Sequence, residues 1–338
     1  MTTSLRSLTT ATAIGCLAIA LPTAANALTC GGAAETKDLT IMADWLPWAS
    51  QGPMMAAQLA GHYKAEGINV KIIAPANPAD PIKLVARQRV TFSLTYVPEV
   101  MISQERGIPV VAVAASMRVL GSGLFYLAKS PIKSPKDLKG MTVGVGPKLD
   151  AQAFLSTLLE SGGLTKKDVK VVDPGYAHVP MVLKNKVQAA HGLTFGEGVV
   201  ADLILQKQGQ KKVQWLLYRD HGVPNFYYQL FVGNTDWVAK NPNTTCRFLR
   251  ATAKGTETWV KTPDAALAVI SKKNKAFKPD QHRGIYVATK AHWREKDGTI
   301  FKQDLAIWQR AQDWAMKKGL LKKKADAQGY FTNAHLPK

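Results

Sequence analysis

The residues best suited to binding a small molecule lie in a loop, residues 44–53 (DWLPWASQGP), that follows the first predicted strand. Trp45 and Trp48 offer indole faces that can sandwich a planar ring, and Gln51 offers an amide that can fix the orientation of that ring. The alternative is that both tryptophans fill the core beneath the loop. We expect these three residues to form part of a site for a planar solute.

Other side chains with suitable chemistry also stand where predicted strands end. Tyr96 and Glu99 follow the strand of residues 90–94, and Glu197 begins a helix after the strand of residues 187–192. The Glu197 carboxylate can accept hydrogen bonds from an amino group or a protonated ring nitrogen. Either glutamate could instead only stabilise the start of its helix. In a later strand, alternation turns either Tyr227 or Tyr228 inward, and we expect it to be Tyr228.

No pattern in the chain predicts catalysis or a metal. Gly121-Ser122-Gly123 lacks the glycines two positions either side of the serine that a nucleophile elbow needs, no HExxH occurs, and the seven histidines are dispersed. Gly144-Val145-Gly146 resembles a dinucleotide fingerprint, but Leu149 stands at the third glycine position. We expect no catalytic residue, no metal and no cofactor, although the helix start after Gly146 could bind an anionic group.

Strands and helices alternate along most of the chain, which predicts an α/β fold with mostly parallel sheets covered by helices. A first set comprises strands 39–43, 68–72, 90–96 and 108–115, with helices 53–67, 81–89 and 98–106. A second set comprises strands 123–128, 141–146, 169–172 and 187–192, with helices 148–161, 178–185 and 197–208. Two such sets in series predict two lobes.

The rest of the chain predicts strands 213–218 and 226–232, followed by helical material from residue 237. We expect this material to return to the first lobe. Residues 36–122 and 236–338 would then form lobe 1 and residues 123–235 lobe 2, with a hinge near 121–128 and 228–236. The carboxyl ends of the strands in both lobes would face each other across a cleft, which is where ligands of open α/β sheets bind.

The first 27 residues are typical of an export signal. A single arginine precedes an apolar stretch of residues 11–21, and Ala25-Asn26-Ala27 offers small residues at the cleavage site. The apolar stretch is shorter than the roughly 20 residues that span a bilayer. We therefore expect a mature protein in the periplasm.

Cysteine usage and charge add two expectations. Removal of the signal leaves Cys30 and Cys246, which could form a disulfide in an oxidising compartment; two free thiols, or a lipid on Cys30, are the alternatives. The formal net charge of +20 could suggest nucleic acid, but the lysines are scattered along polar helix faces. We expect no nucleic-acid partner and a monomeric protein.

Several segments resemble the periplasmic binding proteins for thiamine pyrimidine precursors, within the wider group that includes riboflavin, sulfonate and nitrate binders. They are DWLP from residue 44, ADPIKLVARQRVTFSLTYVPEV from 79, RGIPVVAVAA from 106, IKSPKDLKGMTVG from 132 and HGVPNFYYQLFV from 221. The resemblance covers roughly residues 39–245. It implies a two-lobed periplasmic binding protein of the type II-like kind, closing at its hinge.

The resemblance also implies roles for single residues. Trp45 matches the family's ligand-stacking tryptophan, Tyr96 its cleft tyrosine, and Glu197 the acidic residue that meets the aminopyrimidine. The implied function is capture of a planar heteroaromatic molecule for an ABC permease and ATPase in the membrane. Trp48, Gln51 and Met55 depart from the family's pyrimidine binders, which points to a larger or more apolar ligand, with a flavin or a sulfonate as alternatives.

An enzyme is the alternative from another class. Fungal relatives of this fold synthesise the pyrimidine and consume their own histidine, whose position here is Gln51. The cysteine cluster of those synthases is also missing, and an export signal does not suit that reaction. The sequence therefore favours a binding protein that is not an enzyme.

Overall fold

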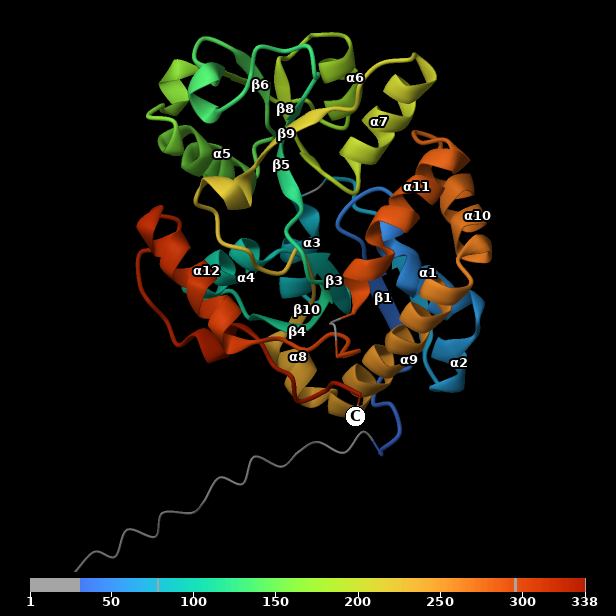
Figure 1. Ribbon diagram of the computed structural model, residues 1–338. Coiled ribbons are helices and arrows are strands. Elements are labelled where there is room, and N and C mark those ends of the chain that lie inside the picture. Colours follow the sequence, from blue (N-terminus) through green and yellow to red (C-terminus); the bar gives the residue numbers. More distant parts are fainter. Residues whose placement is uncertain (1–30, 78, 295–296, 338) are drawn as a thin grey trace, which may run out of the picture.

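The structure is a computed structural model that describes residues 31–77, 79–294 and 297–337. Two five-stranded sheets each form the centre of one lobe (Figure 1). The predicted α/β, two-lobed arrangement is confirmed. The predicted export signal, residues 1–27, lies outside the described residues, as does Cys30.

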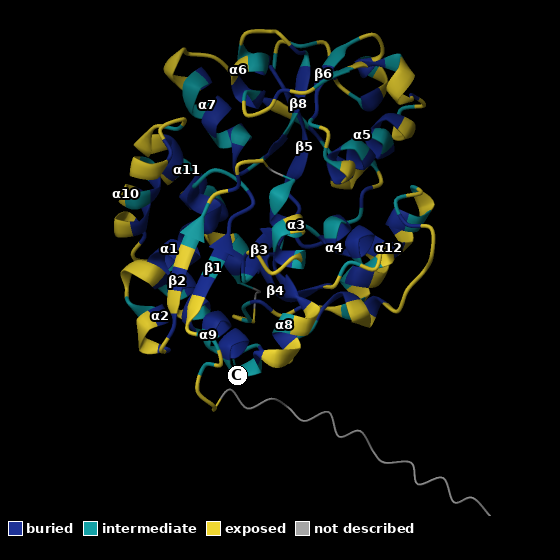
Figure 2. Ribbon diagram, turned by 180° about the vertical axis from the view of Figure 1, so that it is seen from behind, coloured by how far each residue is buried: buried dark blue, intermediate teal, exposed yellow. Residues whose placement is uncertain are grey.

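Lobe 1 is built on a sheet with strand order β2-β1-β3-β10-β4. Its first three strands are parallel, and β10 runs antiparallel between β3 and β4. The strands are β1 (Asp38–Met42), β2 (Asn69–Ile73), β3 (Phe92–Thr95), β4 (Val110–Met117) and β10 (Gln229–Asn234). All eight residues of β4 are buried, because helices cover both faces of this sheet (Figure 2).

The helices of lobe 1 come from both ends of the chain. They are α1 (Gly52–Leu59), α2 (His62–Ala65), α3 (Asp80–Ala86), α4 (Val97–Glu105), α8 (Thr235–Lys240), α9 (Pro242–Lys261), α10 (Asp264–Lys273), α11 (Pro279–Thr289) and α12 (Leu305–Lys317). The single helix predicted over residues 53–67 is two helices, because Gly61 adopts a left-handed conformation (φ +73°) that ends the first.

Lobe 2 repeats the plan with strand order β7-β6-β8-β5-β9, in which β5 is the reversed strand. Its strands are β5 (Ser122–Tyr126), β6 (Thr142–Gly144), β7 (Lys170–Val172), β8 (Ala189–Leu193) and β9 (Gln214–Leu217). Its helices are α5 (Leu149–Ser161), α6 (His178–Leu183) and α7 (Glu197–Lys207).

One predicted boundary is wrong. We expected residues 228–236 to be a crossing and lobe 2 to end at residue 235, but β10 pairs with β3 and β4 in the sheet of lobe 1. The first predicted crossing, residues 121–128, is mostly strand β5 (Ser122–Tyr126) of lobe 2. The chain therefore crosses between the lobes over residues 118–121 and 222–228. The apolar pattern of residues 226–232 predicts a strand, but the choice of sheet depends on which partner strands are free to pair.

The C-terminal helices join the two lobes on either side of the crossings (Figure 1). On one side α11 packs against α7, where Lys207 Nζ lies 2.6 Å from Asp280 Oδ2. On the other side, the indole nitrogen of Trp314 in α12 donates to Thr157 Oγ1 in α5 at 3.3 Å. The lobes therefore enclose the space between them.

The start of the described chain is held on lobe 1. Glu35 accepts hydrogen bonds from the backbone amides of Asn243 and Thr244 at the beginning of α9, at 3.0 and 2.8 Å. Cys246, one turn later, is disulfide-bonded. The predicted pairing with Cys30 is still a prediction, because Cys30 is not among the described residues.

Candidate functional site

The loop between β1 and α1 forms the lobe 1 wall of a cavity between the lobes. Asp44 is fully buried in this loop, and its carboxylate accepts hydrogen bonds from the Tyr96 hydroxyl (2.7 Å) and from Gln51 Nε2 (3.3 Å). Trp45 and Trp48 follow Asp44, and both line the cavity. The loop is thus tied to the end of β3 through Tyr96.

Gln51 does not line the cavity, although the sequence places it among the binding residues. Its side chain is buried and donates to the carbonyl oxygens of Trp45 and Leu46 at 3.3 and 3.4 Å, as well as to Asp44. Gln51 therefore holds the loop that carries the tryptophans. Asn274, between α10 and α11, assists by donating to the carbonyl oxygen of Pro47 at 2.8 Å.

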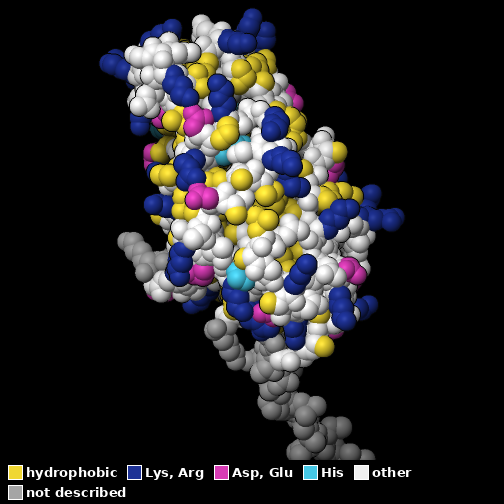
Figure 3. All heavy atoms as spheres, turned by 90° about the vertical axis from the view of Figure 1, so that its right-hand side faces the viewer, with side chains coloured by type: hydrophobic (Ala, Val, Ile, Leu, Met, Phe, Trp, Pro, Cys, Tyr) yellow, Lys and Arg dark blue, Asp and Glu magenta, His cyan; other side chains and the backbone are white. Residues whose placement is uncertain are grey.

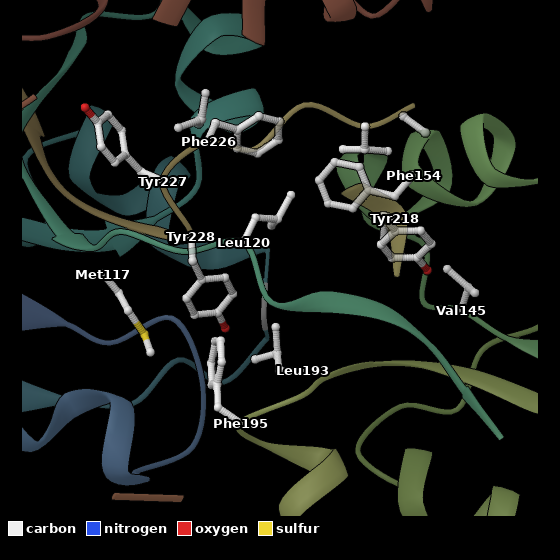
Figure 4. Close-up of a cluster of buried hydrophobic side chains, with 14 of the residues drawn as sticks. Met117, Leu120, Val145, Phe154, Leu193, Phe195, Tyr218, Phe226, Tyr227 and Tyr228 are labelled. Atoms are coloured by element: carbon white, nitrogen blue, oxygen red, sulfur yellow. The ribbon is translucent and has the colours of Figure 1, made fainter. Parts of the chain in front are cut away.

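Tyr96 and Tyr228 form an aromatic pair on the cavity wall, with ring centroids 5.5 Å apart. Burial, and after it the Asp44 carboxylate, raise the pKa of both hydroxyls well above the usual range, so both are neutral donors. Tyr227 and Tyr228 point to opposite sides of the chain (Figure 4). Tyr227 packs inside lobe 1, where its hydroxyl accepts from the Asp304 amide at 2.6 Å, so Tyr228 is the one of the pair at the cavity, as expected.

Glu197 stands on the lobe 2 wall at the first residue of α7. One carboxylate oxygen accepts from the Leu193 amide at 2.9 Å, and the side chain is partly exposed. The preceding residue, Gly196, lies against the Trp48 indole: a Cβ there would be 2.6 Å from Trp48 Cζ3. The binding loop of lobe 1 and the start of α7 in lobe 2 thus meet at Gly196, where any side chain would force the Trp48 ring to move.

The cavity has a volume of about 440 Å³. Five of the six predicted binding residues line it: Trp45, Trp48, Tyr96, Glu197 and Tyr228. Phe154 and Phe226 add apolar surface where the crossings pack together (Figure 4). Aromatic side chains from both lobes with a few polar groups among them suit a small planar molecule.

The polar lining is acidic, unlike the chain as a whole. Four carboxylates line the cavity, those of Asp44, Asp150, Asp173 and Glu197, and Lys148 is the ammonium group among the lining residues. The chain carries a net charge of +20, and Lys and Arg are spread over the face with α1, α7, α10 and α11 (Figure 3). The positive net charge of the chain therefore does not predict the charge of the cavity lining.

Lys148 joins the lobes from inside the cavity. Its Nζ lies 3.6 Å from Glu99 Oε1 and 4.5 Å from the centre of the Tyr96 ring. Burial lowers the pKa of Lys148, but the carboxylates of Glu99, Asp150 and Asp44 raise it overall, so the ammonium group is charged. Glu99, expected to serve either the cleft or its helix, therefore pairs with lobe 2 instead of lining the cavity.

Sequence reasoning missed most of the lining residues of lobe 2. Tyr176 lies edge-on to Trp45 with ring centroids 4.5 Å apart, and it stands half-exposed at the cavity mouth. Lys148, His178 and His191 are among the others, together with Asp150, Phe154 and Asp173. The signals that could have found them are the loops that follow the predicted strands ending at residues 146 and 172, and the predicted strand 187–192 itself, because the carboxyl ends of these strands share the cleft edge.

Two kinds of feature are absent from the described chain. In residues 31–77, 79–294 and 297–337, no group of three or more His, Cys, Asp or Glu side chains could hold a metal ion. No helix in these ranges is long and apolar enough to cross a membrane.

The family follows from the sequence. A model of the family described as NMT1/THI5 like matches residues 48–266, more than half of the chain. The chain belongs to the NMT1/THI5-like family. This family member is 30% identical to the formylaminopyrimidine-binding protein of Halalkalibacterium halodurans over 230 residues, 68% of each chain. It is 27% identical to a 4-amino-5-hydroxymethyl-2-methylpyrimidine phosphate synthase of Saccharomyces cerevisiae over 229 residues, 66% of this chain and 67% of the relative.

Solved structures confirm the predicted fold of this NMT1/THI5-like protein. The periplasmic aliphatic sulphonate binding protein SsuA of Escherichia coli superposes with a TM-score of 0.64, at 15% identity, over 87% of this chain and 92% of its own. At this identity the likeness shows the periplasmic binding protein fold alone.

Proposed function

We propose that this protein is the extracytoplasmic solute-binding component of an ABC importer, and that its cleft captures a small planar heteroaromatic amine such as a thiamine pyrimidine precursor. One observation carries the proposal: aromatic side chains from both lobes enclose a cavity whose carboxylates outnumber its ammonium groups. A flat ring would lie among Trp45, Tyr96 and Tyr228, while Glu197 would accept hydrogen bonds from its amino group. The name of the Halalkalibacterium relative agrees with this chemistry.

The acidic lining distinguishes this ligand from a sulfonate. A sulfonate would bring a negative charge beside four carboxylates, whereas an amino group or a protonated ring nitrogen would gain charge-assisted hydrogen bonds. The apolar wall accepts the carbon skeleton of either compound, so the charge decides between them.

The buried position of Gln51 favours binding over synthesis. By the family resemblance, Gln51 stands where the fungal synthases have the histidine that they consume. The Gln51 side chain, however, is hydrogen-bonded to Asp44 and to the loop backbone and does not line the cavity. A side chain in this position therefore does not reach a bound substrate and could not supply atoms to it. A binding protein predicts lobe closure without turnover.

The test is a thermal-shift and calorimetric comparison of the refolded, ligand-free mature protein with 4-amino-2-methylpyrimidines, riboflavin, taurine and nitrate. A ligand at a hundred times its Kd should stabilise the protein by about 2.7 kcal/mol. We expect this only for the aminopyrimidines. A shift with taurine alone, or product formation from the pyrimidine, would contradict the proposal.

Two variants locate the binding. Trp45→Ala should weaken the affinity at least about tenfold through lost stacking, and Glu197→Gln by a similar factor through lost charge-assisted hydrogen bonding. Asp236→Asn removes a carboxylate from the first turn of α8, away from the cavity, and should leave the affinity unchanged. Unchanged binding in both cleft variants would place the ligand elsewhere.

A further inference from the structure

A group of polar side chains lies on the lobe 2 wall, on elements other than those that carry Trp45, Tyr96 and Tyr228. Asp150, His178 and His191 line the cavity on elements α5, α6 and β8, away from the loop that carries Trp45 and Trp48. Asp150 and His178 are each 8% exposed. Buried polar side chains facing a cavity call for a hydrogen-bonding partner, so their chemistry indicates what the ligand presents to them.

The hydrogen bonds of His178 define the atom that it offers to a ligand. Its Nδ1 lies 2.7 Å from the carbonyl oxygen of His191. Because a carbonyl oxygen only accepts, Nδ1 carries the hydrogen and donates. In the neutral ring Nε2 then has a lone pair, and among the described residues no donor is hydrogen-bonded to it. His178 thus presents an acceptor.

His191 is an uncharged neighbour in this wall. Its Nδ1 lies 3.1 Å from the Tyr218 hydroxyl. Burial, followed by the proximity of His178 and Lys148, lowers the pKa of His191 to about 3. Its ring therefore adds no positive charge that would attract an anionic group at neutral pH.

Asp150 makes the start of α5 unsuited to an anion. Its Oδ1 accepts from the backbone amide of Ala151 at 2.8 Å, so the protein's own carboxylate occupies the helix start. Lys148, the cation beside it, is paired with Glu99 and lies over the Tyr96 ring. An added phosphate would meet a carboxylate here, whereas an ammonium or hydroxyl group would meet two acceptors.

The cavity has room for such a substituent. Its volume of about 440 Å³ falls in the range of roughly 300–1,000 Å³ that holds drug-sized ligands, more than one six-membered ring requires. We propose that Asp150 and His178 form a second subsite, which takes an ammonium or hydroxyl substituent of the bound ring and rejects an anionic one. This inference rests on the proposed function, because the ring supplies the anchor.

The experiment compares four ligands that share the 4-amino-2-methylpyrimidine ring and differ only at carbon 5: methyl, hydroxymethyl, aminomethyl, and the phosphate ester of hydroxymethyl. Isothermal titration calorimetry of the mature protein should give a Kd at least about tenfold lower for aminomethyl than for methyl, with hydroxymethyl between them. The phosphate ester should bind at least about tenfold more weakly than hydroxymethyl.

Matched variants assign the effect to the subsite. Asp150→Asn keeps the shape and the hydrogen bond to Ala151, so it should remove most of the aminomethyl gain while leaving the Kd of the methyl compound unchanged. Asp220→Asn removes the same charge from an exposed residue that does not line the cavity, and it should preserve the gain.

Each outcome decides between the two proposals. If the methyl compound binds but the substituents make no difference, or if the phosphate ester binds most tightly, the subsite is wrong and the proposed function stands. The subsite is also wrong if Asp150→Asn weakens all four ligands equally. If none of the four compounds binds, the proposed function fails together with the subsite.

Discussion

The two tryptophans at the cleft both line the ligand cavity and contact the opposite lobe. Trp48 lines the cavity and also packs against Gly196 of lobe 2, and Trp45 meets Tyr176 in the same way. A change at such a position therefore alters both the site and the closed arrangement. The two effects can be separated at Gly196, because glycine has no side chain that could contact the ligand.

Gly196→Ala is expected to disfavour the closed arrangement. The added Cβ would lie 2.6 Å from a rigid indole atom, so Trp48 or the start of α7 must move. The Kd for an aminopyrimidine should rise several-fold, and small-angle scattering should show weaker compaction on ligand addition. Gly329→Ala, whose Cβ would meet nothing closer than 4.0 Å, is the control. Wild-type compaction in Gly196→Ala would rule out this role.

At the scale of elements, the packing of α1 on α9 sets the position of the binding loop. α1 begins directly after the loop, and the backbone of Gly255 in α9 lies against it: a Cβ there would be 2.4 Å from both Pro53 O and the Ala57 Cβ. Close contact of two helices at a glycine fixes their separation and, through α1, the direction from which the loop enters the cleft.

Gly255→Ala should therefore destabilise the protein by about 1–3 kcal/mol, although alanine favours an isolated helix by about 1 kcal/mol. Urea unfolding should show a lower midpoint. Lys261→Ala, near the exposed end of the same helix, should leave the midpoint nearly unchanged. An increase in stability for Gly255→Ala would mean that α1 and α9 can separate freely.

At the scale of the whole molecule, one carboxylate joins the beginning of the described chain to the helices that return from lobe 2. Burial raises the pKa of Glu35, but hydrogen bonds from Thr244 and Asn243 outweigh it and lower the pKa to about 2, from an ordinary 4.5. The stabilisation is present above pH 4.5 and is lost as the pH falls through about 2.

Glu35→Gln should lower the free energy of unfolding at pH 7 by about 1 kcal/mol, a value reduced by solvent screening of this exposed side chain. The difference from wild type should shrink below pH 4.5 and vanish near pH 2. Urea unfolding at several pH values measures it, with Asp236→Asn as the control. A difference that is constant with pH would show that the Glu35 charge contributes nothing.

Much of the site could be predicted from the chain because its signals are local. Trp45, Trp48 and Glu197 directly follow predicted strands, and strand ends in an α/β fold converge on one edge. The alternation of strands and helices could also be predicted, because hydrophobic periodicity indicates which face of each strand or helix is buried. These features require no knowledge of distant contacts.

Only the tertiary structure decided the remainder. The sheet that β10 joins and the pairing of Lys148 with Glu99 depend on contacts between segments far apart in the chain. So does the polar wall of Asp150 and His178. The loop-holding role of Gln51 rests on contacts inside the loop, but the path of an irregular loop has no periodicity from which to predict it. The sequence by itself determined the two lobes and the aromatic loop, because local periodicity encodes elements; the docking of one lobe on the other decided which side chains share the cavity, because that contact is non-local.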